Sequence, residues 1–205
     1  MFITFEGIDF CGKSTQIDLL EKHLLNKNKK VLVIREPGGT KISEKIRRML
    51  LDKDNSKMFM ETEFLLFSAS RSQLVREKIQ PYLETGFYVI SDRFHDSSSA
   101  YQGYGRGISR DVISSINKLV IGKSVPDITF FIDIPVEVAE QRRQQRSTDN
   151  LDRIENSNED FFYRVREGYL KLAEREKRFK VVNGTKDIEV IHKKIINEIE
   201  KFEHR

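Results

Sequence analysis

The sequence predicts an α/β fold in which helices cover both faces of a five-stranded parallel sheet. Short runs rich in β-branched and aromatic residues alternate with segments in which apolar residues recur every three or four positions. These short runs are apolar at nearly every position, which is typical of parallel strands buried on both faces. In such a doubly wound sheet, ligands bind at the carboxyl ends of the strands.

Each expected strand is bounded by polar or glycine-containing segments. The strands cover residues 2–5, 31–35, 87–91, 128–134 and 179–182. The helices between them follow from apolar side chains that share one face. These positions are Ile17, Leu20 and Leu24; Val112, Ile116 and Leu119; Phe161, Val165, Tyr169 and Leu172; and Ile188, Ile191, Ile195, Ile199 and Phe202. A further helix is expected over about residues 60–78.

Residues 141–158 form the least regular polar segment, rich in Arg, Gln, Asn and Asp. We expect this segment to be too polar to join the core and to act as a short mobile lid. No internal repeat or low-complexity stretch interrupts the rest of the chain. Residues 1–205 are therefore expected to form a single domain with the lid at about 141–158.

Composition narrows the class of protein. With 205 residues and 38% apolar content, the chain can bury one core. A net charge of +4 favours anionic partners without separating small molecules from nucleic acid. The single cysteine excludes an intramolecular disulfide and a cysteine-based metal site. Because no stretch approaches the ~20 apolar residues of a membrane span, we expect a soluble cytoplasmic protein with no membrane partner.

The segment Gly7 to Ser14 satisfies the pattern G-x-x-x-x-G-K-[ST] between an expected strand and an expected helix. Glycines let the backbone amides point inward, and the helix adds the positive end of its dipole. Lys13 is expected to reach the β- and γ-phosphates of a nucleotide, and the Ser14 hydroxyl to ligate Mg²⁺. The bland alternative, a glycine turn with an incidental lysine, does not account for this context.

The residues between the two glycines are unusual for a phosphate site. A carboxylate at Asp9 is unfavourable among phosphates unless it pairs with a cation or receives a hydroxyl. Asp9 is therefore either an exposed loop residue or a group that faces a second substrate. Loop amides and Lys13 favour a thiolate at Cys11, and we expect this thiol to be alkylated quickly and to be protected by ATP.

Three arginines are expected to converge beside this loop. Arg35 ends the second strand, Arg47 lies on the helix that follows it, and Arg93 comes directly after Asp92 at the end of the third strand. Arginine suits bidentate phosphate binding, although each arginine alone could form a surface ion pair. Asp92 occupies the place of a carboxylate in a metal shell, with a helix N-cap as the alternative.

Arg71 interrupts the apolar face of the helix expected at about 60–78, which also carries Phe64, Phe67 and Leu74. An aromatic ring one turn before an arginine can stack on a planar base while the guanidinium donates to a base carbonyl. The alternative is a core phenylalanine beside an arginine whose charged end reaches the surface.

Taken together, these segments resemble the thymidylate kinases over nearly the whole chain. The matching segments are FEGIDFCGKST, REPGGT, LLFSASR, SDRFHDSSSAYQGYGRG, PDITFFIDI and RRQQRSTDNLDRIE. The resemblance implies a P-loop kinase fold and direct in-line phosphoryl transfer from ATP to dTMP, giving dTDP for dTTP and DNA synthesis. It also implies Mg²⁺ as cofactor and a homodimer, with no nucleic-acid partner.

The resemblance further assigns roles at matching positions. Phe67 would stack on thymine, Arg71, Ser98 and Gln102 would hydrogen-bond the base edge, and Tyr101 would crowd the sugar 2′ position. Arg47 and Arg93 would hold the acceptor monophosphate with Arg35 and Glu36 nearby, and Asp9 would lie by the 3′-hydroxyl and the metal. The ATP-binding residues would be Gly7, Ile8, Asp9, Phe10, Cys11, Gly12, Lys13, Ser14, Thr15 and Arg142, and the metal ligands Ser14 and Asp92.

The lid resembles that of the bacterial thymidylate kinases that supply cations from this segment. The phosphate loop carries no arginine, whereas the segment contains Arg142, Arg143, Arg146 and Arg153. Arg146 or Arg153 is expected to be the main lid cation, and the catalytic set would be Lys13, Asp9, Arg93, Arg146 and Arg153. Two positions depart from the family pattern: Phe10, where glycine is common, and His95.

Other function classes fit the sequence less well. A kinase for another nucleoside monophosphate is opposed by the FSASR and SSSAYQG segments, although dUMP stays possible as a slow acceptor. A P-loop GTPase needs an N-K-x-D element and a D-x-x-G switch, but Asn117-Lys118 leads to Leu119-Val120 and Asp92 leads to Arg93. A nucleic-acid-dependent ATPase would need a basic stripe interleaved with exposed aromatic residues, and the sequence shows no such stripe.

Overall fold

The five-stranded parallel sheet is the centre of the molecule. The computed structural model describes residues 1–145 and 151–204, and in this part of the chain the strand order is β2-β3-β1-β4-β5 with every pairing parallel. The predicted strands are confirmed, and their bounds shift by no more than one residue at either end. They are β1 Phe2–Glu6, β2 Val31–Arg35, β3 Tyr88–Asp92, β4 Ile128–Asp133 and β5 Phe179–Asn183.

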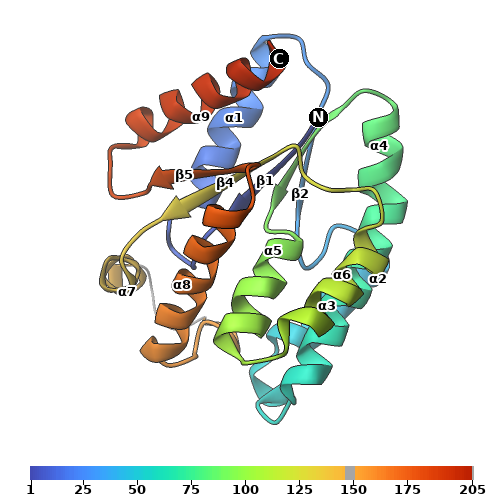
Figure 1. Cartoon of the computed structure of the whole chain (residues 1–205), viewed down its shortest axis with the longest axis vertical. Coiled ribbons are helices and arrows are strands. Elements are labelled where there is room, and N and C mark those ends of the chain that lie inside the picture. Colours follow the sequence, from blue (N-terminus) through green and yellow to red (C-terminus); the bar gives the residue numbers. More distant parts are fainter. Residues whose placement is uncertain (146–150, 205) are drawn as a thin grey trace.

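Helices cover both faces of the sheet (Figure 1). One layer contains α1 and α9, and the other contains α3, α5, α6 and α8. The helix bounds are α1 Lys13–Asn26, α2 Lys41–Leu51, α3 Met60–Leu74, α4 Gln80–Glu84, α5 His95–Ser98, α6 Arg110–Ile121, α7 Val136–Gln145, α8 Glu159–Arg175 and α9 Ile188–Glu203. Shorter turns are η1 Lys53–Asn55, the π-helical η2 Val75–Ile79 and the π-helical η3 Ser99–Gly105. The helix predicted at about 60–78 is therefore confirmed, as α3 followed by η2.

The central strands are buried because helices lie against both of their faces. Every residue of β1 is buried, and Ile3 pairs in register with Ile90 of β3 and Ile128 of β4. At the other end of these strands, Asp92 pairs with Phe5 and with Arg35. The parallel register thus brings the segments that follow β1, β2 and β3 to one edge of the sheet.

The expectation that residues 141–158 are too polar to join the core is wrong at Ile154. This side chain is 7% exposed and packs within the main hydrophobic cluster. Reciprocal hydrogen bonds hold the neighbouring turn: Asp152 Oδ1 accepts from the backbone of Glu155 at 2.9 Å, and Glu155 Oε2 accepts from the backbone of Asp152 at 2.9 Å. Residues 141–145 belong to α7, and Arg146 lies outside the described residues.

Every helix in the described ranges 1–145 and 151–204 is too short or too polar to cross a lipid bilayer.

Candidate active site

A cavity of about 780 Å³ lies at the carboxyl edge of the sheet. Most of the predicted site residues line it, as the strand-end rule for doubly wound sheets requires. These residues are Asp9, Phe10, Cys11, Gly12, Lys13, Ser14, Thr15, Arg35, Glu36, Arg47, Phe67, Asp92, Arg93, Ser98, Tyr101, Gln102 and Arg142. Four predicted residues of the described part of the chain do not line the cavity: Gly7, Ile8, Arg71 and Arg153.

The phosphate loop needs left-handed backbone at several positions. Gly12 has φ 103° and ends the loop where α1 begins. A Cβ on Gly7 would lie 2.6 Å from the Ile132 carbonyl oxygen, so only glycine fits there. Phe10 adopts φ 63°, a conformation that is unfavourable by about 1–2 kcal/mol for a non-glycine residue. Lys13 Nζ donates to the carbonyls of Gly7 and Ile8, at 3.2 Å each.

Asp9 forms a charged cluster with Arg93 and Tyr101. Arg93 Nη2 lies 2.6 Å from Asp9 Oδ1, and the Tyr101 hydroxyl donates to Asp9 Oδ2 at 3.0 Å. Burial opposes ionisation of Asp9, but Arg93 and Lys13 outweigh it and hold the pKa of Asp9 below its usual value. Arg93 has φ 67°, a strained conformation that lets its side chain reach back to the loop. Asp9 is therefore a paired group of the cavity and not an exposed loop aspartate.

Cys11 does not have the properties predicted from the sequence. Its side chain is 1% exposed. Burial raises the pKa of the Cys11 thiol, and the nearby charge of Lys13 offsets this only in part. The prediction of a thiolate favoured by the loop is wrong, because the loop buries the sulfur instead of presenting it to solvent.

Arg71 is held behind the cavity wall. It is 1% exposed, and its Nε lies 2.7 Å from Glu36 Oε1. Its Nη1 donates to Asn117 Oδ1 at 2.9 Å and its Nη2 to Ser98 Oγ at 2.9 Å. Burial raises the pKa of Glu36 to about 7 despite this ion pair. The alternative in which the charged end of Arg71 reaches the surface is therefore wrong, because the side chain is buried, ion-paired with Glu36 and bonded to Ser98 of the cavity lining. Its contact with a base edge stays a prediction.

Arg47 and Arg35 line the cavity together with Phe67, an aromatic residue of α3. Arg47 Nη1 donates to the Pro37 carbonyl at 2.8 Å, and both burial and the charge of Arg35 lower the pKa of Arg47. Arg35 pairs with Glu44 at 3.0 Å, and its side chain is 56% exposed. The expected convergence of Arg35, Arg47 and Arg93 on one cavity is therefore found.

At the opposite end of the cavity, Arg142 lies against the back of the phosphate loop. Its Nη1 donates to the Cys11 carbonyl at 3.3 Å and its Nη2 to the Gly184 carbonyl at 2.8 Å. Gly184 and Lys186 also line the cavity, and the sequence analysis missed them. They lie within three residues of the end of β5, so the strand-end rule could have identified them.

Glu6 is a third residue that the sequence analysis missed. It ends β1 and is fully buried. Its Oε1 accepts from the Phe94 backbone at 2.8 Å, and its Oε2 accepts from the hydroxyls of Ser97 at 2.6 Å and Tyr169 at 2.7 Å. These bonds hold the turn after β3 against the phosphate loop. They join segments more than 80 residues apart, so no local pattern signals them.

Arg153 lies away from the phosphate loop. Its Nη2 is 2.7 Å from Glu63 Oε2, and its Nε donates to the Leu50 carbonyl at 2.8 Å. It borders a separate hollow that Lys53 and Arg106 also line. This placement differs from the predicted one because α3 offers a buried carboxylate at Glu63, which the sequence analysis did not consider.

Asp92 and Ser14 provide suitable groups for Mg²⁺. Asp92 Oδ1 is buried and receives no hydrogen bond from the described residues. Asp92 is not an N-cap, because α5 begins after Phe94. Ser14 lines the same cavity with an exposed side chain. Protein-bound Mg²⁺ usually takes only one or two protein oxygens plus phosphate and water, so this donor set fits the ion.

Comparison with known proteins places this geometry in a family. The family model described as "Thymidylate kinase" matches residues 5–195. A thymidylate kinase of Thermosipho melanesiensis is 50% identical over 195 residues, covering 95% of each chain, and one of Thermosipho africanus is 48% identical over 201 residues, covering 98% of each. The crystal structure of thymidylate kinase from Ehrlichia chaffeensis superposes with a TM-score of 0.79 at 37% identity, covering 98% of both chains. Because the family model spans residues 5–195, including the phosphate loop, and these relatives cover 95% or more of the chain, the chain belongs to the thymidylate kinase family.

Proposed function

We propose that the protein catalyses ATP-dependent phosphorylation of dTMP to dTDP, a step toward dTTP and DNA synthesis. One observation carries the proposal. The cavity that contains Lys13 of the phosphate loop also contains Arg47 and the aromatic ring of Phe67. A kinase that joins two nucleotides needs such a site, with a phosphate cradle for the donor and a basic and aromatic end for the acceptor.

ATP would occupy the end formed by the loop and by Arg142. Loop amides, the dipole of α1 and Lys13 would neutralise the β- and γ-phosphates. Its adenosine portion would extend toward Gly184 and Lys186, which line the cavity beyond Arg142.

dTMP would occupy the end between α2 and α3. Phe67 would stack on the base, Ser98 and Gln102 would read its edge, and Tyr101 would close off the sugar 2′ position. Arg47 and Arg93 would bind the monophosphate, with Arg35 and Glu36 beside it and Asp9 toward the 3′-hydroxyl. Arg71 would act on the base edge through Ser98, which accepts a hydrogen bond from it.

The transfer step needs no general base. A nucleoside monophosphate is largely a dianion at neutral pH, because its second pKa is about 6, so its oxygen can attack directly. Lys13 and the arginines then act by positioning the two phosphates in line and by balancing the negative charge that both bring. We propose Arg146 as the lid cation, while Arg153 secures the lid segment to α3.

Ser14 and Asp92 would hold Mg²⁺ at the phosphate end of the cavity, where the buried Asp92 Oδ1 is available to it. When bound, the ion would supply positive charge that offsets the negative charge of the ATP phosphates.

We also propose how the protein is organised as a domain, where it acts and how it assembles. Residues 1–205 would act as one kinase domain with its lid at about 141–158, in the cytoplasm where ATP is available. We further propose a homodimer through α2, α3 and α6. Helix α3 contacts both of the others, and all three carry exposed apolar side chains.

Coupled measurement of ADP release with ATP and Mg²⁺ tests the function, with dTMP, dUMP, UMP, CMP, GMP and AMP as acceptors. A strong preference for dTMP is expected. K13A should lower kcat by about 100-fold or more, whereas K22A, at an exposed position of the same helix, should leave it unchanged. Turnover with a different monophosphate would contradict the base assignment, and turnover with none would contradict the function.

A further inference from the structure

Glu63 is a buried carboxylate in the first turn of α3 and does not line the main cavity. It is 1% exposed. A charge buried to this degree is strongly unfavourable unless several donors compensate it. Its partners therefore indicate what it does.

These partners come from two other segments of the chain. Gln102 Nε2 donates to Glu63 Oε1 at 2.9 Å. Arg106 reaches both carboxylate oxygens at 3.3 Å, and Arg153 Nη2 lies 2.7 Å from Oε2. Burial opposes ionisation of Glu63, but the Gln102 hydrogen bond and the two arginines outweigh it and hold its pKa below the usual value.

An ionised carboxylate can only accept hydrogen bonds. The NH₂ group of Gln102 must therefore face Glu63, and its carbonyl oxygen must point away from it. Within the described residues no donor bonds to that oxygen, and Gln102 lines the cavity. Gln102 alone could turn either end of its amide toward a ligand, whereas Glu63 permits only the acceptor end.

Ser98 lines the same cavity as Gln102 and offers a ligand a second hydrogen-bonding group. Its Oγ accepts from Arg71 Nη2 at 2.9 Å, which leaves the hydroxyl hydrogen available to a ligand. The wall thus presents an acceptor at Gln102 and a donor at Ser98. Thymine and uracil carry a matching N3–H donor beside the O4 acceptor, whereas cytosine carries an N3 acceptor beside an amino donor.

We propose that Glu63 is a positioning residue that fixes the Gln102 amide with its acceptor toward the base, so that the site selects thymine and uracil over cytosine. The proposal rests on the proposed function, because it concerns the acceptor base of that reaction.

The test compares kcat/KM for dTMP, dUMP and dCMP in the wild type, E63Q and E61Q. A glutamine at position 63 can donate or accept, so the Gln102 amide is free to reverse. E63Q should lower the dTMP-to-dCMP ratio at least tenfold, mainly through a higher KM for dTMP and a lower KM for dCMP, with dUMP following dTMP. E61Q makes the same substitution at an exposed position two residues away and should keep the wild-type ratio within twofold.

E63D keeps a carboxylate and should retain the preference for dTMP over dCMP even if turnover falls. An E63Q enzyme that loses activity equally with dTMP and dCMP would overturn the proposal, since a purely structural role predicts that result. If E63Q does not fold, NMR of the wild type decides. The side-chain amide hydrogens of Gln102 should exchange slowly with solvent, and exchange as fast as in free glutamine would overturn the proposal.

The proposed function fails separately from this inference. A wild type that phosphorylates no pyrimidine monophosphate contradicts the function itself. A wild type that prefers dTMP, together with an E63Q variant that keeps the preference, contradicts only the role of Glu63.

Discussion

Burial shifts the pKa of single residues that line the cavity. Glu36 is 4% exposed, and Arg71 is its one ion-pair partner within the described part of the chain. Burial raises the pKa of Glu36 to about 7 from an ordinary 4.5. A carboxyl that binds its proton more tightly in the folded state stabilises the fold below the unfolded pKa, and this contribution is lost as the pH rises through the folded pKa.

We therefore expect the free energy of unfolding to fall between about pH 4.5 and 7, with Glu36 contributing at most about 3 kcal/mol of the loss. E36Q cannot ionise at this position and should lose less stability over that range than the wild type. Urea denaturation at about pH 5 and pH 8 measures the difference. E84Q removes an exposed carboxyl and should follow the wild type. Equal losses in E36Q and the wild type would show that Glu36 is already ionised at pH 5.

The burial of Cys11 gives a second prediction at this scale. Because the sulfur is 1% exposed and its thiol pKa is raised, iodoacetamide should react with the native protein at least about 100-fold more slowly than with the unfolded chain. Mass spectrometry of timed samples measures both rates at the single cysteine. A native rate within tenfold of the unfolded rate would mean that the loop opens readily and exposes the sulfur.

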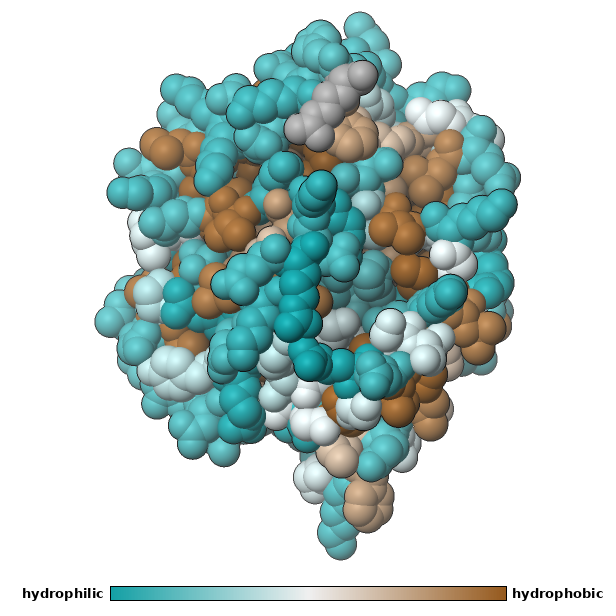
Figure 2. Space-filling view, viewed as in Figure 1, coloured by the Kyte–Doolittle hydropathy of each residue, from teal (hydrophilic) through white to brown (hydrophobic). Residues whose placement is uncertain are grey.

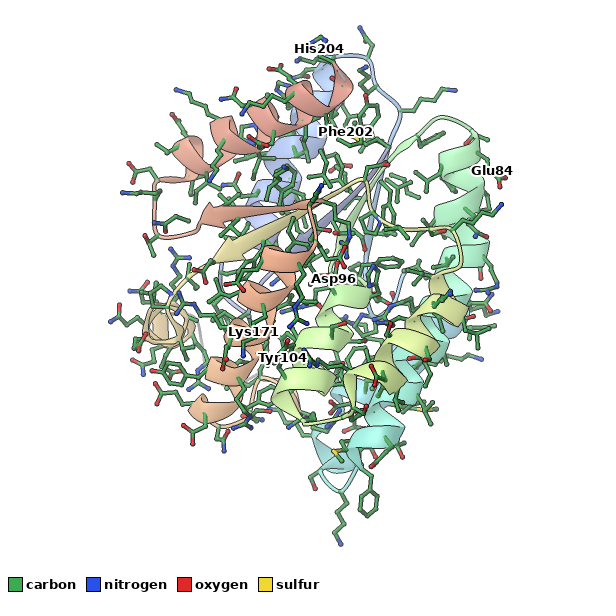
Figure 3. The ribbon with its side chains drawn as sticks, in the orientation of Figure 1. Glu84, Asp96, Tyr104, Lys171, Phe202 and His204 are labelled. Carbon is green, nitrogen blue, oxygen red and sulfur yellow. The ribbon has the colours of Figure 1, made fainter. Side chains whose placement is uncertain are left out.

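At the scale of elements, the cavity depends on close packing between η3 and α8. Glycines allow this approach: a Cβ on Gly105 would lie 2.5 Å from the Phe161 ring and 2.9 Å from Val165. Further along the same contact, Tyr104 of η3 lies beside Lys171 of α8 (Figure 3), with the Lys171 ammonium 5.6 Å from the centre of the Tyr104 ring. Since η3 carries Tyr101 and Gln102, this packing sets the position of the proposed base site.

G105A should lower the free energy of unfolding by about 1–3 kcal/mol, because the new methyl group overpacks the contact. Helix propensity alone predicts the opposite sign, a gain of about 1 kcal/mol for glycine to alanine. Denaturant unfolding separates the two. In the double variant G105A/F161L, the combined loss should be smaller than the sum of the single losses, because leucine makes room for the methyl group. A stabilised G105A would contradict the close packing.

At the scale of the whole molecule, exposed apolar side chains occur on the neighbouring helices α2, α3 and α6. Figure 2 shows apolar surface over α6 within a largely hydrophilic face. The exposed apolar residues of these helices are Ile42 and Met49 of α2, Met60 and Leu65 of α3, and Val112 and Leu119 of α6. Exposed apolar side chains on neighbouring helices are typical of protein interaction sites, which supports the proposed homodimer.

L119E should dissociate this dimer, because Leu119 is 75% exposed and a charge there would be buried on association. Sedimentation equilibrium should find twice the 24.1 kDa chain mass for the wild type and the single mass for L119E. V190E places the same charge at a 54% exposed position on α9, in the opposite helix layer, and should remain dimeric. A wild type of single-chain mass at micromolar concentration would contradict the homodimer.

A feature of the fold or the site could be predicted from the sequence where it depends on residues that are close together in the chain. The sheet and the phosphate loop arise from local patterns: continuous apolar runs make the strands, and the spacing of Gly7, Gly12 and Lys13 makes the cradle. The convergence of Arg35, Arg47 and Arg93 was also predictable, because all parallel strands end at the same edge. The sequence by itself therefore determined the fold class, the cavity's location and most of its lining.

The tertiary structure alone decided how the buried polar groups are paired. Glu63 binds Gln102 and Arg153, which lie 39 and 90 residues away, and no local pattern selects those partners. The burial of Cys11 and the enclosure of Arg71 likewise depend on segments that pack around them from elsewhere in the chain. The fold determines which charges are removed from water and which partners they meet. The roles of these residues therefore follow from the fold and not from their neighbours in sequence.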